Sequence, residues 1–325
     1  MLATERGAIR MELYFLGTNA GVPTLQRNVT SIGLRMLDER RALWLFDCGE
    51  GTQHQILSSP LKLSKLEKIF ITHLHGDHVF GLPGLLSSRA YQGGTTPLTV
   101  YGPPGTERMI TTAMELSQSR INYELKIMEH TGGLLFEDES FIVESALLEH
   151  RIDSYGYRIT EKDRPGSLDQ AKLAEYGLKP GPLFGRLKRG ETITLDDGSV
   201  VRPEDVLGAP KRGKVITILG DTRPCANVLP LAQHADVLVH EATFMDDLAD
   251  TAHEYYHSTA KQAAEAARAA DVGELIMTHF SSRYKDEEQL QPLLDEAKTV
   301  FPNSRLANEH QLIPVIHHLN GSQLQ

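Results

Sequence analysis

The sequence has little cysteine and no long apolar run, and each absence excludes a class of protein. Two cysteines, Cys48 and Cys225, cannot form a disulfide framework, so we expect structural thiols, a reducing compartment and no disulfide-linked partner. No apolar stretch approaches the roughly 20 residues that cross a bilayer, and the N-terminal MLATERGAIR lacks the apolar core of a signal peptide. We therefore expect a cytoplasmic protein with no membrane partner.

The chain also lacks an excess of positive charge, since its formal net charge is −10. Phosphate attraction scales with the number of cationic contacts, so this charge argues against a protein that coats nucleic acid without specificity. It does not exclude a local cationic cleft, which bound metal ions can supply. With 325 residues, 40% of them hydrophobic and 23% charged, the chain can bury a large core.

Several short runs of Val, Ile, Leu and Phe stop abruptly at polar residues, as buried strands do when they deliver side chains to a site. The runs are MELYFLG before Thr18 and Asn19, ALWLF before Asp47, KIFIT before His73, FIVESALL before Glu149 and His150, VITILG before Asp221, VLV before His240 and Glu241, and ELIMT before His279. Helical candidates lie between the runs at residues 105–118, 258–270 (with Ser258 as the cap) and 286–299. Alternating strands and helices predict an α/β layered fold.

One segment, from about residue 161 to 198, has weaker apolar periodicity and many proline and glycine residues. We interpret it as an inserted, protruding arm. Within it, KPGPLFGRLKRG (179–190) has four cationic residues and no acidic one: Lys179, Arg186, Lys188 and Arg189. An ordinary solvated loop is the alternative for such a charge run.

The segment THLHGDH, residues 72–78, carries the clearest chemistry. His73, His75, Asp77 and His78 follow a predicted strand, so one tight loop can direct three imidazoles and a carboxylate at one volume. These ligand types suit Zn²⁺, with manganese or iron as competitors, and the lack of a cysteine ligand argues against a structural zinc. Gly76 allows the loop to turn without a side chain in the way.

This loop alone nearly completes one metal site, so ligands at other strand ends indicate a second ion. His150, Asp221 and His279 are the candidates. Asp221 is the only carboxylate among them, and a carboxylate can bridge two ions about 3.5–4 Å apart. Each of the three taken alone is more often a surface or core residue, but their shared position at strand ends favours the metal role.

These motifs resemble the metallo-β-lactamase superfamily, and others narrow the resemblance to bacterial ribonuclease Z, the tRNA 3′-processing endonuclease. The narrower set consists of FLGTNAGVPTLQRNVTS (15–31), WLFDCGEGTQHQ (44–55), HGDHVFGLPGLL (75–86), PGPLFGRLKRG, VLVHEATF (237–244) and YYHSTAKQAA (255–264). The resemblance covers residues 11 to about 318, which we expect to be the catalytic domain. Residues 319–325 are then a tail, and residues 1–10 are either an extension or precede the true start at Met11.

The resemblance implies a fold, cofactors and partners. The fold is an αβ/βα sandwich of the metallo-β-lactamase type with a protruding arm, and the arm is an exosite that grips tRNA away from the cut. The implied activity is cleavage of precursor tRNA after the discriminator base, leaving a 3′-hydroxyl on the tRNA. The resemblance also implies a homodimer with two Zn²⁺ per subunit, for which Mn²⁺ could substitute. One metal is held by His73, His75 and His150, the other by Asp77, His78 and His279, and Asp221 bridges them.

Catalytic roles follow as hypotheses. Asp77 can orient the attacking water or accept its proton, although its role as a ligand would also explain its presence. His257 is the best proton donor for the leaving ribose oxygen, and Glu241 can hold its tautomer; the alternative is that both only support the metal ligands. Asp47 is assigned to support of a ligand histidine.

Three further residues, Thr30, Ser31 and Arg283, suit contacts with phosphate or sugar, and each could equally be structural. Two other functions compete with the main one. A different hydrolase of the same fold could act on a small phosphodiester, sulfate ester, thioester or lactam, since the ligands alone do not choose a substrate. A non-catalytic RNA-binding or dimerisation module would need a degenerate site, which the complete ligand set disfavours.

Overall fold

A computed structural model describes residues 11–37 and 40–318 of the chain. The expected N-terminal extension and C-terminal tail therefore lie outside the described residues. The chain divides into two compact units, one formed by residues 161–213 and the other by the rest of the described chain.

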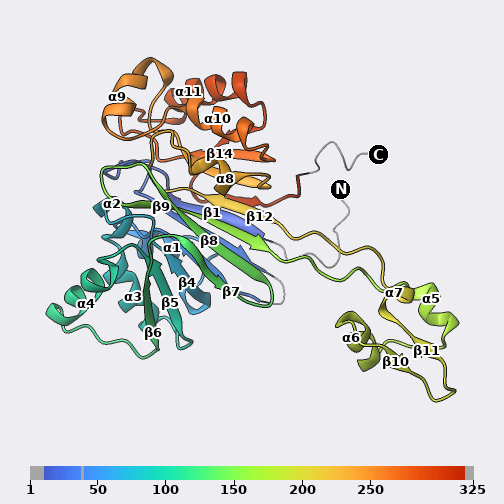
Figure 1. Ribbon diagram of the computed structural model, residues 1–325. Helices are drawn as coiled ribbons and strands as arrows, with labels where there is room; N and C mark the ends of the chain where they lie inside the picture. Colours follow the sequence, from blue (N-terminus) through green and yellow to red (C-terminus); the bar gives the residue numbers. More distant parts are fainter. Residues whose placement is uncertain (1–10, 38–39, 319–325) are drawn as a thin grey trace. The chain divides into compact units, whose positions relative to one another are not determined.

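The larger unit is built on two seven-stranded sheets (Figure 1). The first has the order β16-β1-β2-β3-β4-β5-β6 and comprises β1 (Met11–Gly17), β2 (Ser31–Met36), β3 (Leu43–Phe46), β4 (Leu66–Phe70), β5 (Leu98–Gly102), β6 (Leu125–Glu129) and β16 (Leu312–Pro314). The second has the order β15-β14-β13-β12-β9-β8-β7 and comprises β7 (Gly133–Glu137), β8 (Phe141–Leu148), β9 (Ser154–Glu161), β12 (Val215–Ile218), β13 (Val237–Glu241), β14 (Glu274–Thr278) and β15 (Ser304–Leu306).

Helices cover the outer face of each sheet, which gives the expected αβ/βα layers (Figure 1). Those on the first sheet are α1 (Thr52–Leu57), α2 (Gly76–Val79), α3 (Leu82–Tyr91) and α4 (Thr106–Leu116), with a 3₁₀ turn at Leu63–Lys65. Those on the second are α8 (Val228–Ala232), α9 (Ala249–Glu254), α10 (Ala260–Ala269) and α11 (Glu287–Val300), with a 3₁₀ turn at Asp246–Leu248. No helix of the described chain is long and apolar enough to span a membrane.

Three apolar clusters hold these layers together. The central one lies between the sheets and includes Trp44, Phe70 and Phe141, each essentially unexposed, from both sheets. Each outer cluster joins a sheet to its own helices. Cys48 lies in one of these clusters and Cys225 packs against the other, and neither is in a disulfide within the described residues.

The topology explains why the polar strand ends meet. Strands β3 to β6 run parallel to one another, as do β12 to β15. Carboxyl ends of parallel strands lie at one edge of a sheet, so the residues that follow them gather there. Backbone hydrogen bonds link the two sheets at this edge, including Tyr155 N–H to Thr72 C=O at 2.9 Å and Ala20 N–H to Phe280 C=O at 2.9 Å.

The predicted helices are present, but one cap differs. The side chain of Thr259, rather than Ser258, accepts the backbone N–H of Gln262 at the start of α10, and the Gln262 side chain accepts from Thr259 in return. Ser258 instead donates its hydroxyl to the carbonyl of Thr222 at 2.6 Å. A serine next to a threonine offers two candidate caps, and only the tertiary contacts of Ser258 decide between them.

The smaller unit, residues 161–213, ends later than the sequence suggested. It contains α5 (Gln170–Glu175), α6 (Pro182–Lys188), β10 (Ile193–Thr194), β11 (Val200–Val201) and α7 (Pro203–Val206). Residue 198 falls in the turn between β10 and β11, which pair antiparallel. The unit has a small core of its own, formed by Leu173, Leu187, Ile193, Val201 and Val206. Because Val201 and Val206 complete this core, the boundary moves from 198 to 213.

Candidate metal centre and active site

The densest group of candidate ligands lies on the loop that follows β4 and in the short helix α2. His73 and His78 are buried there, at 0% and 1% exposure, while His75 and Asp77 line a cleft. A Cβ atom at Gly76 would lie 2.2 Å from the ring of Phe80, so a larger residue here would have to displace this exposed side chain.

The first group of donor atoms joins this loop to the end of β8. His75 Nδ1 lies 3.1 Å from His73 Nε2 and 3.1 Å from His150 Nε2. Asp221, which follows β12, directs Oδ2 toward the same group, at 3.7 Å from His73 Nε2 and 3.9 Å from His150 Nε2. Three histidines and one carboxylate oxygen thus surround one small volume.

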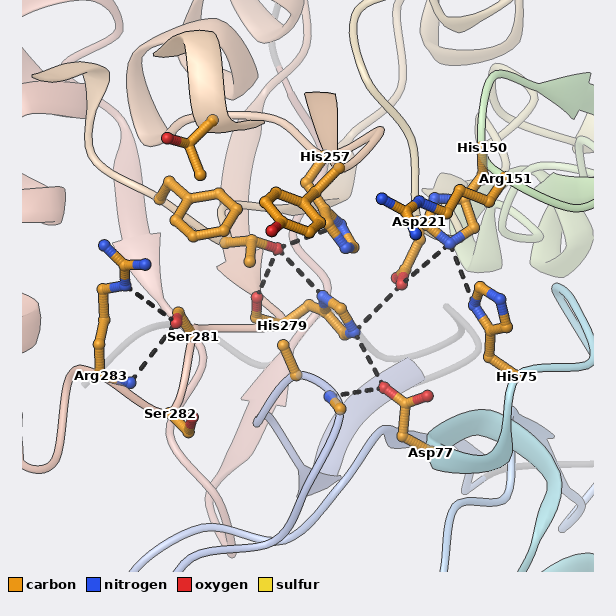
Figure 2. A pocket seen from close by; sticks show the side chains of 16 residues that line it. His75, Asp77, His150, Arg151, Asp221, His257, His279, Ser281, Ser282 and Arg283 are labelled. Carbon is orange, nitrogen blue, oxygen red and sulfur yellow. Dashed lines mark hydrogen bonds and ion pairs between the residues drawn. The ribbon is translucent and has the colours of Figure 1, made fainter. Parts of the chain in front are cut away.

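The second group joins α2 to the end of β14. His279 Nε2 lies 3.3 Å from His78 Nε2 and 3.4 Å from Asp77 Oδ2. Asp221 also reaches this group, with Oδ2 at 3.2 Å from His279 Nε2 and Oδ1 at 3.5 Å from His78 Nε2. The carboxylate of Asp221 therefore stands between the two groups, as Figure 2 shows for His75, His150, His279 and Asp77 on either side of it.

These spacings fit two divalent cations. Donors around a tetrahedral zinc with bonds of roughly 2.0–2.1 Å lie about 3.3 Å apart, and the donor atoms of the two groups are separated by 3.1 to 3.9 Å. Burial, the largest influence, together with the neighbouring imidazoles lowers the pKa of His73 well below its ordinary value, so this ring stays neutral and keeps a lone pair for a metal. His73, His75 and His150 would hold one ion, and Asp77, His78 and His279 the other.

Hydrogen bonds from the opposite ring nitrogens orient the ligand histidines. His78 Nδ1 donates to Asp47 Oδ2 at 2.7 Å, which is the contact expected of Asp47. His279 Nδ1 donates to Thr243 Oγ1 at 3.1 Å, and His150 Nδ1 donates to a backbone carbonyl at 3.0 Å. Each bond favours the tautomer that leaves the Nε2 lone pair directed at the metal volume.

Backbone strain marks the same region. Asp47, Tyr256 and His279 have φ angles of 57°, 61° and 58°, in the left-handed region that residues with a side chain rarely adopt. Such conformations persist where surrounding contacts determine them, and they occur often at functional sites. Here they direct a supporting carboxylate, a ligand-orienting carbonyl and a ligand imidazole toward the centre.

A buried carboxylate–histidine pair adjoins the ligands. Glu241 Oε1 accepts a hydrogen bond from His257 Nδ1 at 2.8 Å. Glu241 also accepts from the backbone N–H groups of Thr222 at 2.8 Å and Ser258 at 3.1 Å, and from the hydroxyl of Thr243 at 2.6 Å. Burial would lower the pKa of His257, but the Glu241 carboxylate outweighs it and raises the pKa to about 9. The His257 ring therefore favours its protonated form.

A cleft of about 540 Å³ opens onto the ligands and this pair. Its lining includes His75, Asp77, Asp221 and His257. The His257 ring lies between two ligand rings, with its centroid 5.1 Å from that of His150 and 5.4 Å from that of His279. A phosphodiester in the cleft could thus contact both metal positions and a proton donor at once.

Known proteins are similar to this chain along nearly its whole length. A ribonuclease Z of Bacillus licheniformis is 54% identical over 305 residues, which cover 93% of this chain and 99% of that protein. The chain belongs to the ribonuclease Z family.

Solved structures and a family profile extend this result. The crystal structure of human tRNase Z, short form (ELAC1), aligns with a TM-score of 0.70 and 32% identity, covering 94% of this chain and 100% of that one. The metallo-β-lactamase fold protein YhfI from Bacillus subtilis aligns with a TM-score of 0.65 over 94% of this chain and 99% of that one; at 18% identity it shows the fold alone. A profile described as Anti-Pycsar protein Apyc1 matches residues 11–122. The expected fold, family and enzyme class are confirmed.

In this ribonuclease Z family member, two residues that were expected to contact RNA are buried away from the cleft. Thr30 and Ser31 are 5% and 0% exposed and do not line the cleft. The Ser31 hydroxyl donates to the carbonyl of Asp47 at 3.0 Å, and the carbonyl of Thr30 accepts the N–H of Gly49 at 3.0 Å. Both support the turn that holds Asp47, so their assignment to RNA contact is corrected to a structural one. Motif position alone could not reveal this burial.

Arg283, the third residue of that set, does line the cleft. Two other lining residues, Arg151 and Tyr255, were missed. Arg151 directly follows the ligand His150, and Tyr255 lies two residues before His257, so proximity to site residues was the signal that could have indicated them. However, no sequence motif marks an arginine or a tyrosine next to a ligand as functional, and only the fold brings Arg151 and Tyr255 together.

The four cationic residues of the 179–190 stretch are exposed, but two of them are paired. Arg186 Nε donates to Glu191 Oε2 at 2.8 Å, and Arg189 Nε donates to Glu191 Oε1 at 3.1 Å. Glu191 lies one residue beyond the stretch that was noted for having no acid. Lys179 and Lys188 are exposed as well, but the local positive charge is smaller than the sequence stretch suggested.

Proposed function

We propose that this ribonuclease Z family member removes the 3′ trailer from precursor tRNA by hydrolysing the phosphodiester after the discriminator base, leaving a 3′-hydroxyl on the tRNA. The observation that carries the proposal is the pair of donor groups sharing Asp221 beside Glu241 and His257 in one open cleft. The names of the relatives, ribonuclease Z and tRNase Z, support the choice of tRNA as substrate.

The proposed cofactors are two Zn²⁺ ions, with Mn²⁺ as a substitute, held by the seven residues expected from the resemblance. When bound, such ions activate water and offset the negative charge of the phosphate. His73, His75 and His150 are the ligands proposed for one position. Asp77, His78 and His279 are the ligands proposed for the other, and Asp221 is the proposed bridge.

Asp77 is proposed to orient the attacking water and accept its proton. Its Oδ2 lies 3.6 Å from His78 Nε2 and accepts the backbone N–H of Gly21 at 2.7 Å. These contacts fix the carboxylate in the lining of the cleft. Burial raises the pKa of Asp77, but the neighbouring histidines outweigh burial and hold the pKa well below the usual range. Asp77 is therefore ionised at neutral pH and can accept a hydrogen bond from the water.

His257 is proposed to donate a proton to the leaving oxygen. As the water oxygen bonds to phosphorus, the bond from phosphorus to the ribose 3′ oxygen breaks, and that oxygen takes the proton. With Nδ1 bonded to Glu241, the Nε2–H of His257 is the group available for this transfer. Glu241 thus holds the imidazole in its useful tautomer and favours its charged form.

The 161–213 unit is proposed as an exosite for tRNA, because a hydrolase of small esters has no evident need for a separate Gly/Pro-rich unit that carries a cationic stretch. Arg164 pairs antiparallel with Lys211, so the residues between them can be deleted without separating the two paired segments. Replacing residues 165–210 by a two-residue Asn-Gly turn would close the two paired residues into a hairpin. This change should weaken binding of precursor tRNA and leave hydrolysis of bis(p-nitrophenyl) phosphate largely intact; equal loss of both would assign the unit a structural role.

The decisive experiment incubates the purified protein with a 3′-extended tRNA precursor and maps the cut to the nucleotide. A single cut after the discriminator base, absent in the Asp221→Ala variant, is the expected result. No cleavage in the presence of either zinc or manganese would overturn the proposal. The homodimer implied by the resemblance is proposed with it, and light scattering of the purified protein tests it.

A further inference from the structure

The wall of the cleft next to His150 carries an arginine–aromatic pair that the proposed chemistry leaves unused. The Arg151 guanidinium carbon lies 5.2 Å from the centroid of the Tyr255 ring. Both residues line the cleft that holds the candidate ligands, and the Tyr255 side chain is 49% exposed. Figure 2 shows Arg151 at one side of the cleft and Arg283 at the other, with Asp221 and His279 between them.

The second arginine of the cleft gives a useful contrast. The Arg283 guanidinium carbon also lies over an aromatic ring, 5.0 Å from the centroid of Phe244. Phe244 is only 7% exposed, so this ring packs in the protein and has little free surface. Of the two pairs, only the one formed by Arg151 and Tyr255 presents an open aromatic ring to the cleft.

Packing and ion pairing do not account for the Arg151–Tyr255 pair. A ring that is half exposed contributes little to a core, and among the described residues no carboxylate forms an ion pair with Arg151. By contrast, Arg223, which lies 4.3 Å from the Tyr256 ring, is bound to Glu149 at 2.8 Å. The Arg151 guanidinium is therefore available to interact with a group that enters the cleft.

The backbone ties this pair to the reacting centre. Tyr255 directly follows α9. The next residue, Tyr256, has a φ of 61°, and its carbonyl accepts a hydrogen bond from His150 Nδ1 at 3.0 Å. His257, the proposed proton donor, follows in the same turn. Arg151 is the residue after His150. A nucleobase stacked on the Tyr255 ring would thus lie close to His257, where the nucleotide that carries the leaving 3′ oxygen is expected.

We propose that Tyr255 and Arg151 form a stacking site for the nucleobase on the 5′ side of the scissile phosphate, which in precursor tRNA is the discriminator base. This inference rests on the proposed function. Aromatic rings and guanidinium planes stack on any nucleobase, because every base has a π face. The site would position the leaving nucleotide without selecting its identity, so changing this base among the four should alter the rate little.

The test compares four enzyme forms on two substrates. The forms are wild type, Tyr255→Ala, Tyr255→Phe and Arg151→Ala, and the substrates are a 3′-extended tRNA precursor and the same RNA with an abasic discriminator position. On the intact substrate, Tyr255→Ala should lower single-turnover kcat/KM about 5- to 150-fold, the range found when a stacking residue is replaced by alanine. Tyr255→Phe keeps the ring and should stay within about twofold of wild type, and Arg151→Ala should show a partial loss.

The abasic substrate supplies the deciding control. Wild type should cut it more slowly by a similar factor, and on it Tyr255→Ala should act at the wild-type rate, since there is no base left to stack. If Tyr255→Ala slows both substrates equally, or if only an abasic nucleotide on the 3′ side of the cut removes its effect, the inference is overturned while the proposed function stands. If wild type cuts neither precursor, both are overturned.

Discussion

Replacing His257 by alanine separates proton donation from metal binding. His257 contacts Glu241 through Nδ1 at 2.8 Å and lies beside, but outside, the two ligand groups. An unactivated ribose 3′ oxygen is a poor leaving group and needs a proton, whereas a p-nitrophenolate leaves without one. The variant should therefore be slow on tRNA and nearly normal on bis(p-nitrophenyl) phosphate.

The magnitude follows from the role. A positioned general acid contributes roughly 10²- to 10⁴-fold to rate, or about 2.7–5.4 kcal/mol of the activation free energy. We expect a loss of this size in single-turnover cleavage of a 3′-extended tRNA precursor. Hydrolysis of the p-nitrophenyl ester should change by less than about threefold, and the metal content should remain unchanged by elemental analysis.

Glu241→Gln is the matched control. Glu241 accepts four hydrogen bonds in a buried position, and a glutamine amide cannot accept all of them, so we expect a stability loss of about 1–3 kcal/mol. It should also remove the carboxylate that raises the pKa of His257 and so slow tRNA cleavage selectively. If either variant slowed both substrates to the same extent or lost metal, the pair would be a support for the metal ligands and the proton-donor role would be refuted.

Three further predictions concern other parts of the molecule. Asp221→Ala should lose metal, measured by elemental analysis, and activity on both substrates together, because Asp221 faces both donor groups; a variant that kept two metals would contradict the bridging role. Glu191→Gln should free Arg186 and Arg189 and tighten precursor tRNA binding by about two- to tenfold at low salt, with the gain fading at high salt; unchanged affinity would argue against contact of this surface with RNA. Burial raises the pKa of Glu309 to about 7. This carboxyl therefore favours the folded state below the unfolded pKa of roughly 4.3, and the advantage is lost as pH rises through 7. The free energy of unfolding of Glu309→Gln in urea, relative to that of wild type, should therefore increase by up to about 3 kcal/mol between pH 5 and pH 8, at roughly 1.4 kcal/mol per pKa unit. A difference between the two proteins that stays constant over this range would refute the raised pKa of Glu309.

Much of the site was predictable because each ligand follows a buried strand. Short β-branched and aromatic runs are easily recognised, and the polar residue that ends each run was the signal for His73, His150, Asp221 and His279. The pairing of Asp47 with a ligand histidine was expected on the same basis, and the structure shows it.

The errors came from residues whose role depends on neighbours distant in sequence. Thr30 and Ser31 have the right chemistry for RNA, but the fold buries them against the turn at Asp47. The unit around the basic stretch extends to residue 213, because Val201 and Val206 fill a core that has no long apolar run.

The sequence by itself determined the strands, the ligand types and their attachment to strand ends, since these depend on local periodicity and on residues a few positions apart. Tertiary structure alone decided that Asp221 faces both donor groups and that Arg151 lies over Tyr255. The physical reason is range: hydrogen bonds, ion pairs and ring contacts act over a few ångströms, and only the folded chain brings residues 104 positions apart to that distance.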